Sequence, residues 1–286
     1  MSNNKIILVT GGTGKQGGAV ARNLKQHGYT VKVLTRNIDS PKALDLKRQN
    51  IILVKGDLNK PETYREHLKD VYGIFSVQTF ENGISKEIRQ GIGLATLAMD
   101  AGVKHFLYSS AIGAHLNTGV PHLESKFIIE NHIRDMALPF TIIRPASFYE
   151  NFLIPQVKKG ILNGKLSQPI NSNTIIPYIA TDEIGKAAVN IFGNLKEYSG
   201  KTLTLGNELL NPLEVAEKFS KALNKKIEYK RLPAIIVRLF LGKNLYKMFR
   251  WMDESSALLV EDVESNRAEF PEMETLSNWI KINFKA

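Results

Sequence analysis

Three glycines near the start of the chain have a spacing that suits phosphate binding. Gly11, Gly14 and Gly17 lie within Thr10-Gly11-Gly12-Thr13-Gly14-Lys15-Gln16-Gly17, after the apolar run 6–9 and before a segment with helical periodicity. The first glycine permits a tight turn, the second lets backbone approach a diphosphate, and the third lets a helix pack closely on a sheet. The amides from Thr13 to Gln16 would then face the diphosphate at the positive end of that helix. The pattern predicts a dinucleotide-binding loop, and the alternative is a purely structural turn.

The residues after the second apolar run indicate which dinucleotide this loop would take. An NAD site has a carboxylate about 20 residues beyond the glycines, where it binds the ribose 2′-hydroxyl. Here that place holds Thr35-Arg36-Asn37, and the first acid is Asp39. A guanidinium stacks on adenine and pairs with a 2′-phosphate, and Lys15 would add a second positive charge. Arg36 therefore favours NADP(H) over NAD(H), with a solvated loop arginine as the alternative.

A carboxylate follows the third apolar run, in Gly56-Asp57-Leu58. One interpretation places Asp57 near the adenine amino group of a bound dinucleotide. The other makes it a turn or capping residue ahead of the helix expected at Pro61. The spacing leaves both open.

The elements that would position these residues alternate along the first 145 residues. Apolar, β-branched runs at 6–9, 31–34, 51–54, 73–77, 105–108 and 140–143 read as strands. Helical periodicity fits the segments between most of them, at 43–48, 61–68, 85–100 and 122–136. Near-continuous apolar strands indicate a sheet covered on both faces, and the alternation indicates parallel pairing through right-handed crossovers. We predict an α/β Rossmann fold, a doubly wound parallel sheet with a smaller interleaved C-terminal α+β lobe.

The alternating pattern ends after Arg144. We expect residues 1–150 to form an NAD(P)-binding Rossmann domain, with 180–206 adding to its sheet, and residues 151–179 and 207–286 to form a lobe for substrate or partner. Asn211-Pro212-Leu213-Glu214 has the residues of a capped helix start. The other expected elements of this part are helices at 181–192, 235–252, 255–260 and 276–284 and strands at 201–205 and 226–231.

Composition excludes several classes of protein. The chain has 286 residues, 43% of them hydrophobic, with no cysteine, so disulfides, thiolate metal sites and cysteine nucleophiles are excluded. His105, His115 and His132 lack metal-ligand spacing, and we expect no metal. The sequence contains no run of about 18 apolar residues, so it predicts no membrane span. The first residues do not have the pattern of a secretory signal. We expect a cytoplasmic protein without membrane contact.

The net charge of +10 raises the question of nucleic-acid binding. Residues 221–250 carry nine lysines and arginines and one acid, whereas residues 251–275 carry eight acids and one arginine. These blocks nearly cancel, and no base-stacking motif accompanies the basic one. We expect no nucleic-acid partner.

Taken together, several segments resemble the NmrA-like family of atypical short-chain dehydrogenase/reductases. They are the glycine loop at 11–18, Thr35-Arg36-Asn37, Gly56-Asp57, and the stretches 122–126, 144–152 and 178–185. The resemblance covers essentially the whole chain and implies a Rossmann sheet with a small C-terminal lobe. It also implies contacts with the cofactor: Val77, Gln78 and Thr79 would line it, Arg89 would reach its phosphates, Lys126 would contact the nicotinamide ribose, and Ser147, Phe148, Tyr149 and Glu150 would border the nicotinamide.

The catalytic pattern of the superfamily is incomplete here. Its usual tyrosine lies four residues before the lysine on one helix, where the ammonium lowers the pKa of the phenol. Lys126 fills the lysine position, but His122 takes the place of the tyrosine. Histidine, with an ordinary pKa of about 6.5, is suited to proton transfer, although a structural role is the alternative. Tyr149 is another candidate proton donor, or else an aromatic wall against the cofactor.

Two functions fit these residues. The first is an NAD(P)H-dependent reductase that transfers a hydride directly to a quinone or similar conjugated carbonyl. Such an acceptor needs no positioned acid, and similar proteins in the NmrA-like group are reductases of this kind. The second is a non-catalytic NADP(H)-binding redox sensor that regulates a protein partner. The missing tyrosine is compatible with both.

Overall fold

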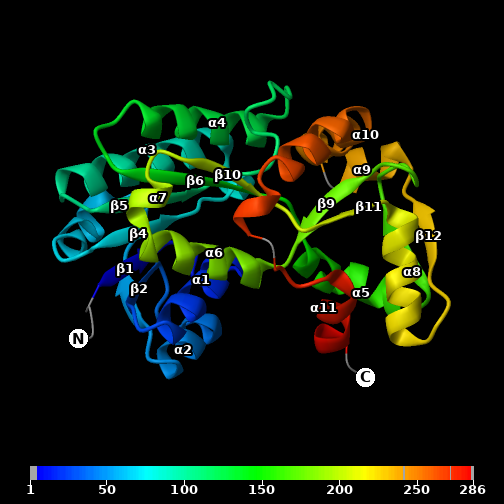
Figure 1. Ribbon diagram of the computed structural model, residues 1–286, viewed down its shortest axis with the longest axis horizontal. Coiled ribbons are helices and arrows are strands. Elements are labelled where there is room, and N and C mark those ends of the chain that lie inside the picture. The colour runs from blue at the N-terminus through cyan, green and yellow to red at the C-terminus, as the bar shows by residue number, and fades with distance from the viewer. Residues whose placement is uncertain (1–4, 241, 271, 285–286) are drawn as a thin grey trace. The chain divides into compact units, whose positions relative to one another are not determined.

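The computed structural model describes residues 5–240, 242–270 and 272–284 (Figure 1). The prediction that the first residues are not a secretory signal concerns residues 1–4 among others, and these four lie outside the described ranges. The chain divides into two compact units. The sheet unit comprises residues 1–111, 125–144 and 181–203, and the second unit comprises residues 112–124, 145–180 and 204–286. The segments 112–124 and 145–150, expected within the first domain, and residues 204–206, expected with its sheet, group with the second unit.

A seven-stranded sheet, counted over the described residues, forms the core of the sheet unit. Its order is β10-β6-β5-β4-β1-β2-β3. The strands are β1 (Ile6–Val9), β2 (Thr30–Thr35), β3 (Ile52–Lys55), β4 (Gly73–Ser76), β5 (His105–Ser109), β6 (Phe140–Pro145) and β10 (Thr202–Leu205). β1 pairs in parallel with both β2 and β4, so the direction of winding reverses between β1 and β4. The prediction of a doubly wound Rossmann fold is confirmed.

Helices cover both faces of this sheet because alternate strand residues are apolar on each side. Figure 1 shows α3 (Ile84–Asp100) and α4 (Pro121–Arg134) on one face and α1 (Lys15–Gln26) and α6 (Thr181–Gly193) on the other. On the α3–α4 face, Leu8, Ile74 and Phe106 pack in one cluster with Leu94 and Ile129 of the helices. The shorter helices of this unit are α2 (Pro41–Arg48) and α7 (Leu195–Tyr198).

The helix expected at 61–68 is instead a pair of 3₁₀ turns. They are η1 (Pro61–Thr63) and η2 (Arg65–Leu68). Tyr64 separates them with a non-helical φ of −136°. Its ring is almost completely buried, so side-chain packing here takes precedence over regular helical hydrogen bonding. A further 3₁₀ turn, η3 (Phe80–Asn82), precedes α3.

The second unit contains two small sheets and several helices. β7 (Ser147–Phe148), β9 (Ile176–Ile179) and β11 (Glu208–Leu210) form one sheet, and β8 (Lys165–Gln168) pairs with β12 (Glu228–Arg231). The helices are α5 (Pro155–Leu162), α8 (Pro212–Leu223), α9 (Ala234–Phe240), α10 (Gly242–Glu264) and α11 (Leu276–Asn283), with 3₁₀ turns η4 (Tyr149–Leu153) and η5 (Arg267–Glu269). The predicted capping box is present, because Asn211 accepts from the Glu214 amide and the Glu214 carboxylate accepts from the Asn211 amide.

The long C-terminal helix differs from the sequence prediction. The segment expected to be one helix, 235–252, divides into α9 and α10, and residue 241 lies outside the described ranges. Gly242 has a φ of +83°, a conformation that favours glycine. The break expected between residues 252 and 255 occurs as a kink inside α10, where Ser255 has a non-helical φ of −128° and ψ of 19°.

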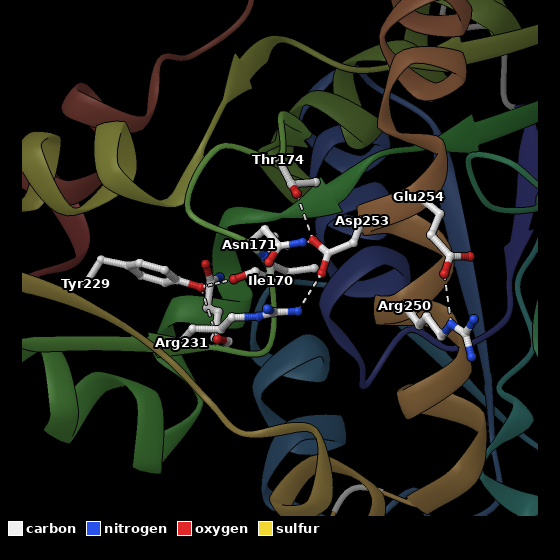
Figure 2. A network of polar contacts seen from close by, with 9 residues as sticks. Ile170, Asn171, Thr174, Tyr229, Arg231, Arg250, Asp253 and Glu254 are labelled. Atoms are coloured by element: carbon white, nitrogen blue, oxygen red, sulfur yellow. Dashed lines mark hydrogen bonds and ion pairs between the residues drawn. The ribbon is translucent and has the colours of Figure 1, made fainter.

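Asp253 fixes α10 to two other parts of the second unit (Figure 2). Its Oδ1 accepts hydrogen bonds from the Asn171 amide, at 2.8 Å, and from the Thr174 hydroxyl, at 2.7 Å. Its Oδ2 lies 3.1 Å from the Arg231 guanidinium at the end of β12. One carboxylate therefore holds the loop before β9 and the end of β12 against the same helix.

None of the helices in the described ranges combines the length and apolar character that crossing a bilayer requires.

Candidate cofactor site

The glycine loop between β1 and α1 has a geometry that excludes side chains at particular positions. Gly11 has a left-handed φ of +63°, and its carbonyl accepts a hydrogen bond from the Gly14 amide at 2.8 Å. A Cβ at Gly17 would lie 2.5 Å from the carbonyl oxygens of Thr10 and Gly11. A Cβ at Gly14 would meet only the Gly11 oxygen, at 3.1 Å. Gly17 is therefore required for α1 to pack on the end of β1, whereas Gly14 is exposed to solvent at the helix N-terminus.

The remaining loop residues differ in exposure. Gly12 is buried, Thr13 and Gln16 are half-buried, and Lys15 is exposed. Gln16 is in the first turn of α1, and its Oε1 accepts a hydrogen bond from the Ser109 hydroxyl at 2.7 Å. Since Ser109 is the last residue of β5, this bond joins the glycine loop to the carboxyl end of a second strand.

The segment after β4 lies against the same loop. The Thr10 hydroxyl donates to the Val77 carbonyl at 3.0 Å and accepts from the Val77 amide at 2.8 Å. A Cβ at Gly11 would lie 2.8 Å from the Val77 side chain. Gln78 is buried and donates to the Ser76 hydroxyl, and Thr79 is exposed and accepts from the Glu81 amide. The structure thus brings Val77 to the glycine loop, at the point where the sheet reverses its winding.

Arg36 is exposed immediately after β2. The Oδ1 of Asn37 accepts a hydrogen bond from the Asp39 amide at 3.0 Å, which shapes the turn that leads into α2. The pKa of Asp57 lies below its ordinary value, chiefly because the carboxylate accepts a hydrogen bond from the Asn59 backbone, with smaller contributions from the charges of Arg36 and Lys86. Positive charge from two elements therefore gathers near Asp57.

Asp57 itself has the turn role that the sequence left open. Its Oδ1 accepts from the backbone amide of Asn59, at 2.9 Å, and from the Asn59 side chain, at 2.7 Å. Lys86, at the start of α3, was not among the residues singled out in the sequence, because a single lysine on a helix carries no spacing signal. Arg89, one turn further along α3, is exposed.

Lys126 belongs to a buried ion pair on the α3–α4 face of the sheet. Its Nζ lies 3.0 Å from Oε1 of Glu87, and the Ser125 hydroxyl donates to Oε2 of Glu87 at 2.6 Å. The Glu87 side chain is fully buried, and that of Lys126 is 10% exposed. Sequence reasoning missed Glu87, since it lies 39 positions before Lys126 on a different helix.

The other residues of the sequence-based site lie in the second unit. Ser147 and Phe148 form β7 and pair with Tyr178 and Ile179 of β9, and Glu150 is half-buried. Tyr149 is fully buried, and its hydroxyl donates to the Glu208 carboxylate at 2.8 Å. Burial and the neighbouring Glu208 charge raise the pKa of Tyr149 far above its ordinary value. This environment opposes proton release from Tyr149.

His122 is buried at the second position of α4, four residues before Lys126. Tyr108 is fully buried in β5, and its pKa is raised, first by burial and then by the charges of Glu87 and Glu130. Among the described residues, no group of three histidine, aspartate or glutamate side chains is arranged to hold a metal ion.

A cavity of about 570 Å³ lies elsewhere on the sheet unit, lined by Lys5, Tyr72 and Lys104 among others. These residues precede β1, β4 and β5, at the amino ends of the strands. In an open parallel α/β sheet, ligands bind at the carboxyl ends. The glycine loop, not this cavity, therefore marks the candidate cofactor site.

Fold and loop together define a Rossmann-type protein with a glycine-rich turn at the switch point of its sheet. Residues 3–280 match the model of the NmrA-like family, and the chain belongs to this family. A relative from Dictyostelium discoideum, described as an NmrA-like family domain-containing protein, is 33% identical over 242 residues, which cover 79% of this chain and 80% of the relative. The resemblance inferred from the sequence is confirmed.

Solved structures share the fold. An NADPH-dependent quinone oxidoreductase from Escherichia coli, in complex with NADPH, superimposes with a TM-score of 0.81 at 19% identity, over 98% of this chain and 100% of that one. NmrA, a negative transcriptional regulator in complex with NADP, superimposes with a TM-score of 0.77 at 21% identity, over 97% of this chain and 94% of that one. One neighbour is thus a reductase and the other a regulator.

Proposed function

We propose that the chain binds NADP(H), with its diphosphate at the loop 11–17. The observation that carries the proposal is the turn itself, which leaves no space for a Cβ at Gly17 and ends on the exposed amide-rich start of α1. Unpaired amides at a helix N-terminus bind phosphate. The first turn of α1 contains no acidic side chain that would compete with an anion. The start of α1 therefore suits a diphosphate electrostatically.

NADP(H) rather than NAD(H) is the proposed form of the cofactor. No carboxylate follows β2 directly, and Arg36 takes the position where an NAD site would have one. A guanidinium binds a 2′-phosphate through two parallel hydrogen bonds. Arg36 is exposed immediately after β2 and is therefore accessible to such a phosphate.

For the reaction, we propose reduction of a quinone or a similar conjugated carbonyl. NADPH supplies a hydride when it is bound. Lys126 would hold the nicotinamide ribose, and its charge is compensated by Glu87. No tyrosine lies four residues before Lys126, and a quinone needs none, since solvent can protonate its oxygens. The E. coli quinone oxidoreductase that shares this fold supports the choice of acceptor.

A second candidate is a redox sensor that binds NADP(H) without turnover and regulates a protein partner. The specific observation in its favour is His122, which takes the place of the usual tyrosine and is buried at the start of α4. The regulator that shares this fold, in complex with NADP, gives independent support.

Two measurements test these proposals in sequence. Calorimetry with NADPH and NADH tests binding, and we expect a lower Kd for NADPH. NADPH oxidation in the presence of benzoquinones and naphthoquinones then tests turnover. Binding with turnover supports the reductase, and tight binding without turnover supports the sensor. If neither NADPH nor NADH gave any heat of binding, both the reductase and the sensor proposals would be overturned.

A further inference from the structure

We propose that Glu87 is a positioning residue that orients Lys126 for the cofactor. The inference rests on the proposed function, because Lys126 is the residue assigned to the nicotinamide ribose. It goes beyond that assignment, since Glu87 lies on a different helix and matches no motif in the sequence. The argument depends only on residues of the sheet unit.

The first step is the cost of the buried charge. The Glu87 side chain is fully buried, and an ionised carboxylate is expensive to bury unless it is paired and hydrogen-bonded. Both of its oxygens are used, Oε1 by the Lys126 ammonium at 3.0 Å and Oε2 by the Ser125 hydroxyl at 2.6 Å. With Oε2 held by Ser125, the carboxylate presents Oε1 to Lys126 in a fixed direction.

The second step is the effect on Lys126. A lysine side chain has many rotamers, and it loses much of this conformational freedom when the ammonium is fixed. The Glu87 contact fixes it before any ligand arrives, and an ammonium has three donors, so others remain for ribose hydroxyls. Preorganisation of this kind increases affinity without a direct contact to the ligand.

The third step is the precision of the helix contact. A Cβ at Gly91 would lie 2.7 Å from the side chain of Ile129. Gly91 is one turn after Glu87 on α3, and Ile129 is one turn after Ser125 on α4. The glycine therefore lets the two helices approach closely beside the ion pair, which keeps Glu87 and Lys126 in register.

Glu130 provides an internal comparison. It is also fully buried on α4, and it pairs with Arg144 at 2.6 Å and with Arg134 at 2.8 Å. Arg144 is 7% exposed in β6, so this carboxylate joins α4 to the sheet. None of these three residues was assigned to the cofactor. A purely structural buried carboxylate should behave like Glu130, and a positioning carboxylate should not.

The experiment compares Kd values for NADPH and for 2′-phospho-ADP-ribose, which lacks the nicotinamide. We expect Glu87→Gln to weaken NADPH binding about tenfold, because it removes the carboxylate charge that holds the Lys126 ammonium, and to leave 2′-phospho-ADP-ribose binding unchanged. Glu130→Gln should lower the Tm and change neither Kd. In the background of Lys126→Met, Glu87→Gln should cause no further loss of NADPH affinity, because the residue that it orients is gone.

Ser125→Ala gives a milder test in case Glu87→Gln does not fold. It keeps both charges and removes the hydrogen bond to Oε2, so NADPH affinity should fall by about threefold while 2′-phospho-ADP-ribose binding stays constant. Unchanged NADPH affinity in both variants, or additive losses with Lys126→Met, would overturn the positioning role. If the unmodified protein binds neither ligand, the proposed function itself fails, which is a distinct result.

Discussion

The Tyr149 hydroxyl donates a hydrogen bond of 2.8 Å to Oε2 of Glu208, inside the second unit. Glu208 also pairs with Lys218 at 2.9 Å and accepts from the Leu276 amide at the start of α11. Tyr149 is thus one of three donors on a single carboxylate. The hydrogen bond links η4 with β11 and α11, and it occupies the group that the sequence offered as a proton donor.

Tyr149→Phe should therefore affect stability more than chemistry. Removal of a hydrogen bond to a charged acceptor costs about 1.5–3 kcal/mol, so urea denaturation should show a lower free energy of unfolding. The Kd for NADPH and any kcat with a quinone should stay within about twofold of the unmodified protein. A large fall in kcat at unchanged stability would instead identify Tyr149 as the proton donor.

Arg36→Ala should discriminate between the two nicotinamide cofactors. Loss of a charge-assisted contact with the 2′-phosphate should weaken NADPH binding by about 1–3 kcal/mol and leave NADH binding nearly unchanged. Calorimetry with both nucleotides measures this difference. Arg48→Ala, on the exposed surface of α2, is the matched control and should change neither affinity. Equal losses for NADPH and NADH would contradict the assignment of Arg36.

Substitutions of Gly17 and Gly14 in the glycine loop should have different effects on stability and on NADPH binding. Gly17→Ala places a methyl group 2.5 Å from backbone carbonyl oxygens, and such overpacking costs about 1–3 kcal/mol. Gly14 has a φ of −95°, and a Cβ there would meet one backbone oxygen at 3.1 Å, so Gly14→Val should destabilise the fold less than Gly17→Ala does but should lose NADPH binding. Thermal unfolding and calorimetry together separate the two effects. NADPH affinity retained by Gly14→Val would show that the loop is only a turn.

His105 should make stability depend on pH. Burial lowers its pKa to about 4, from an ordinary value of 6.5. The unfolded chain therefore takes up a proton as pH falls below 6.5 while the folded protein does not. This difference should reduce the free energy of unfolding by about 3 kcal/mol between pH 6.5 and 4. Above pH 7 the residue is neutral in both states and should contribute no slope.

The variant His105→Gln tests whether His105 causes this pH dependence. The Thr141 hydroxyl donates to the Tyr198 carbonyl, so it must accept from Nε2 of His105, at 2.8 Å. The side-chain amide of His105→Gln can donate in the same way without titrating. The difference in unfolding free energy between the two proteins should be constant above pH 7 and shrink below pH 6.5. A constant difference down to pH 4 would refute the prediction.

The strands and most helices of the sheet unit followed from the sequence because each has a period that the chain itself records. The eight strands expected in the described residues all occur within a few residues of their predicted bounds. Prediction was less successful where a single residue decides the backbone, as at the buried Tyr64 between two 3₁₀ turns and at Gly242, which has a positive φ at the start of α10. Neither position interrupts a hydrophobic period.

The residues of the candidate site also divide into those that the sequence could predict and those that it could not. The glycine loop and Arg36 could be found because their spacing relative to the strands is local. Glu87 and Lys86 could not, since their proximity to Lys126 and Asp57 arises only when distant segments pack together. Tyr149 was assigned to the cofactor site because of the family resemblance. Nothing in the sequence indicates that Glu208, 59 residues away, would accept a hydrogen bond from the Tyr149 hydroxyl.

Each of the two units is assembled from three separate stretches of the chain, so the polypeptide passes from one to the other five times. No single cut releases either unit as a continuous fragment, and gene fusion or exon exchange cannot transplant one alone. Neither unit can therefore be expressed as one continuous segment of this chain.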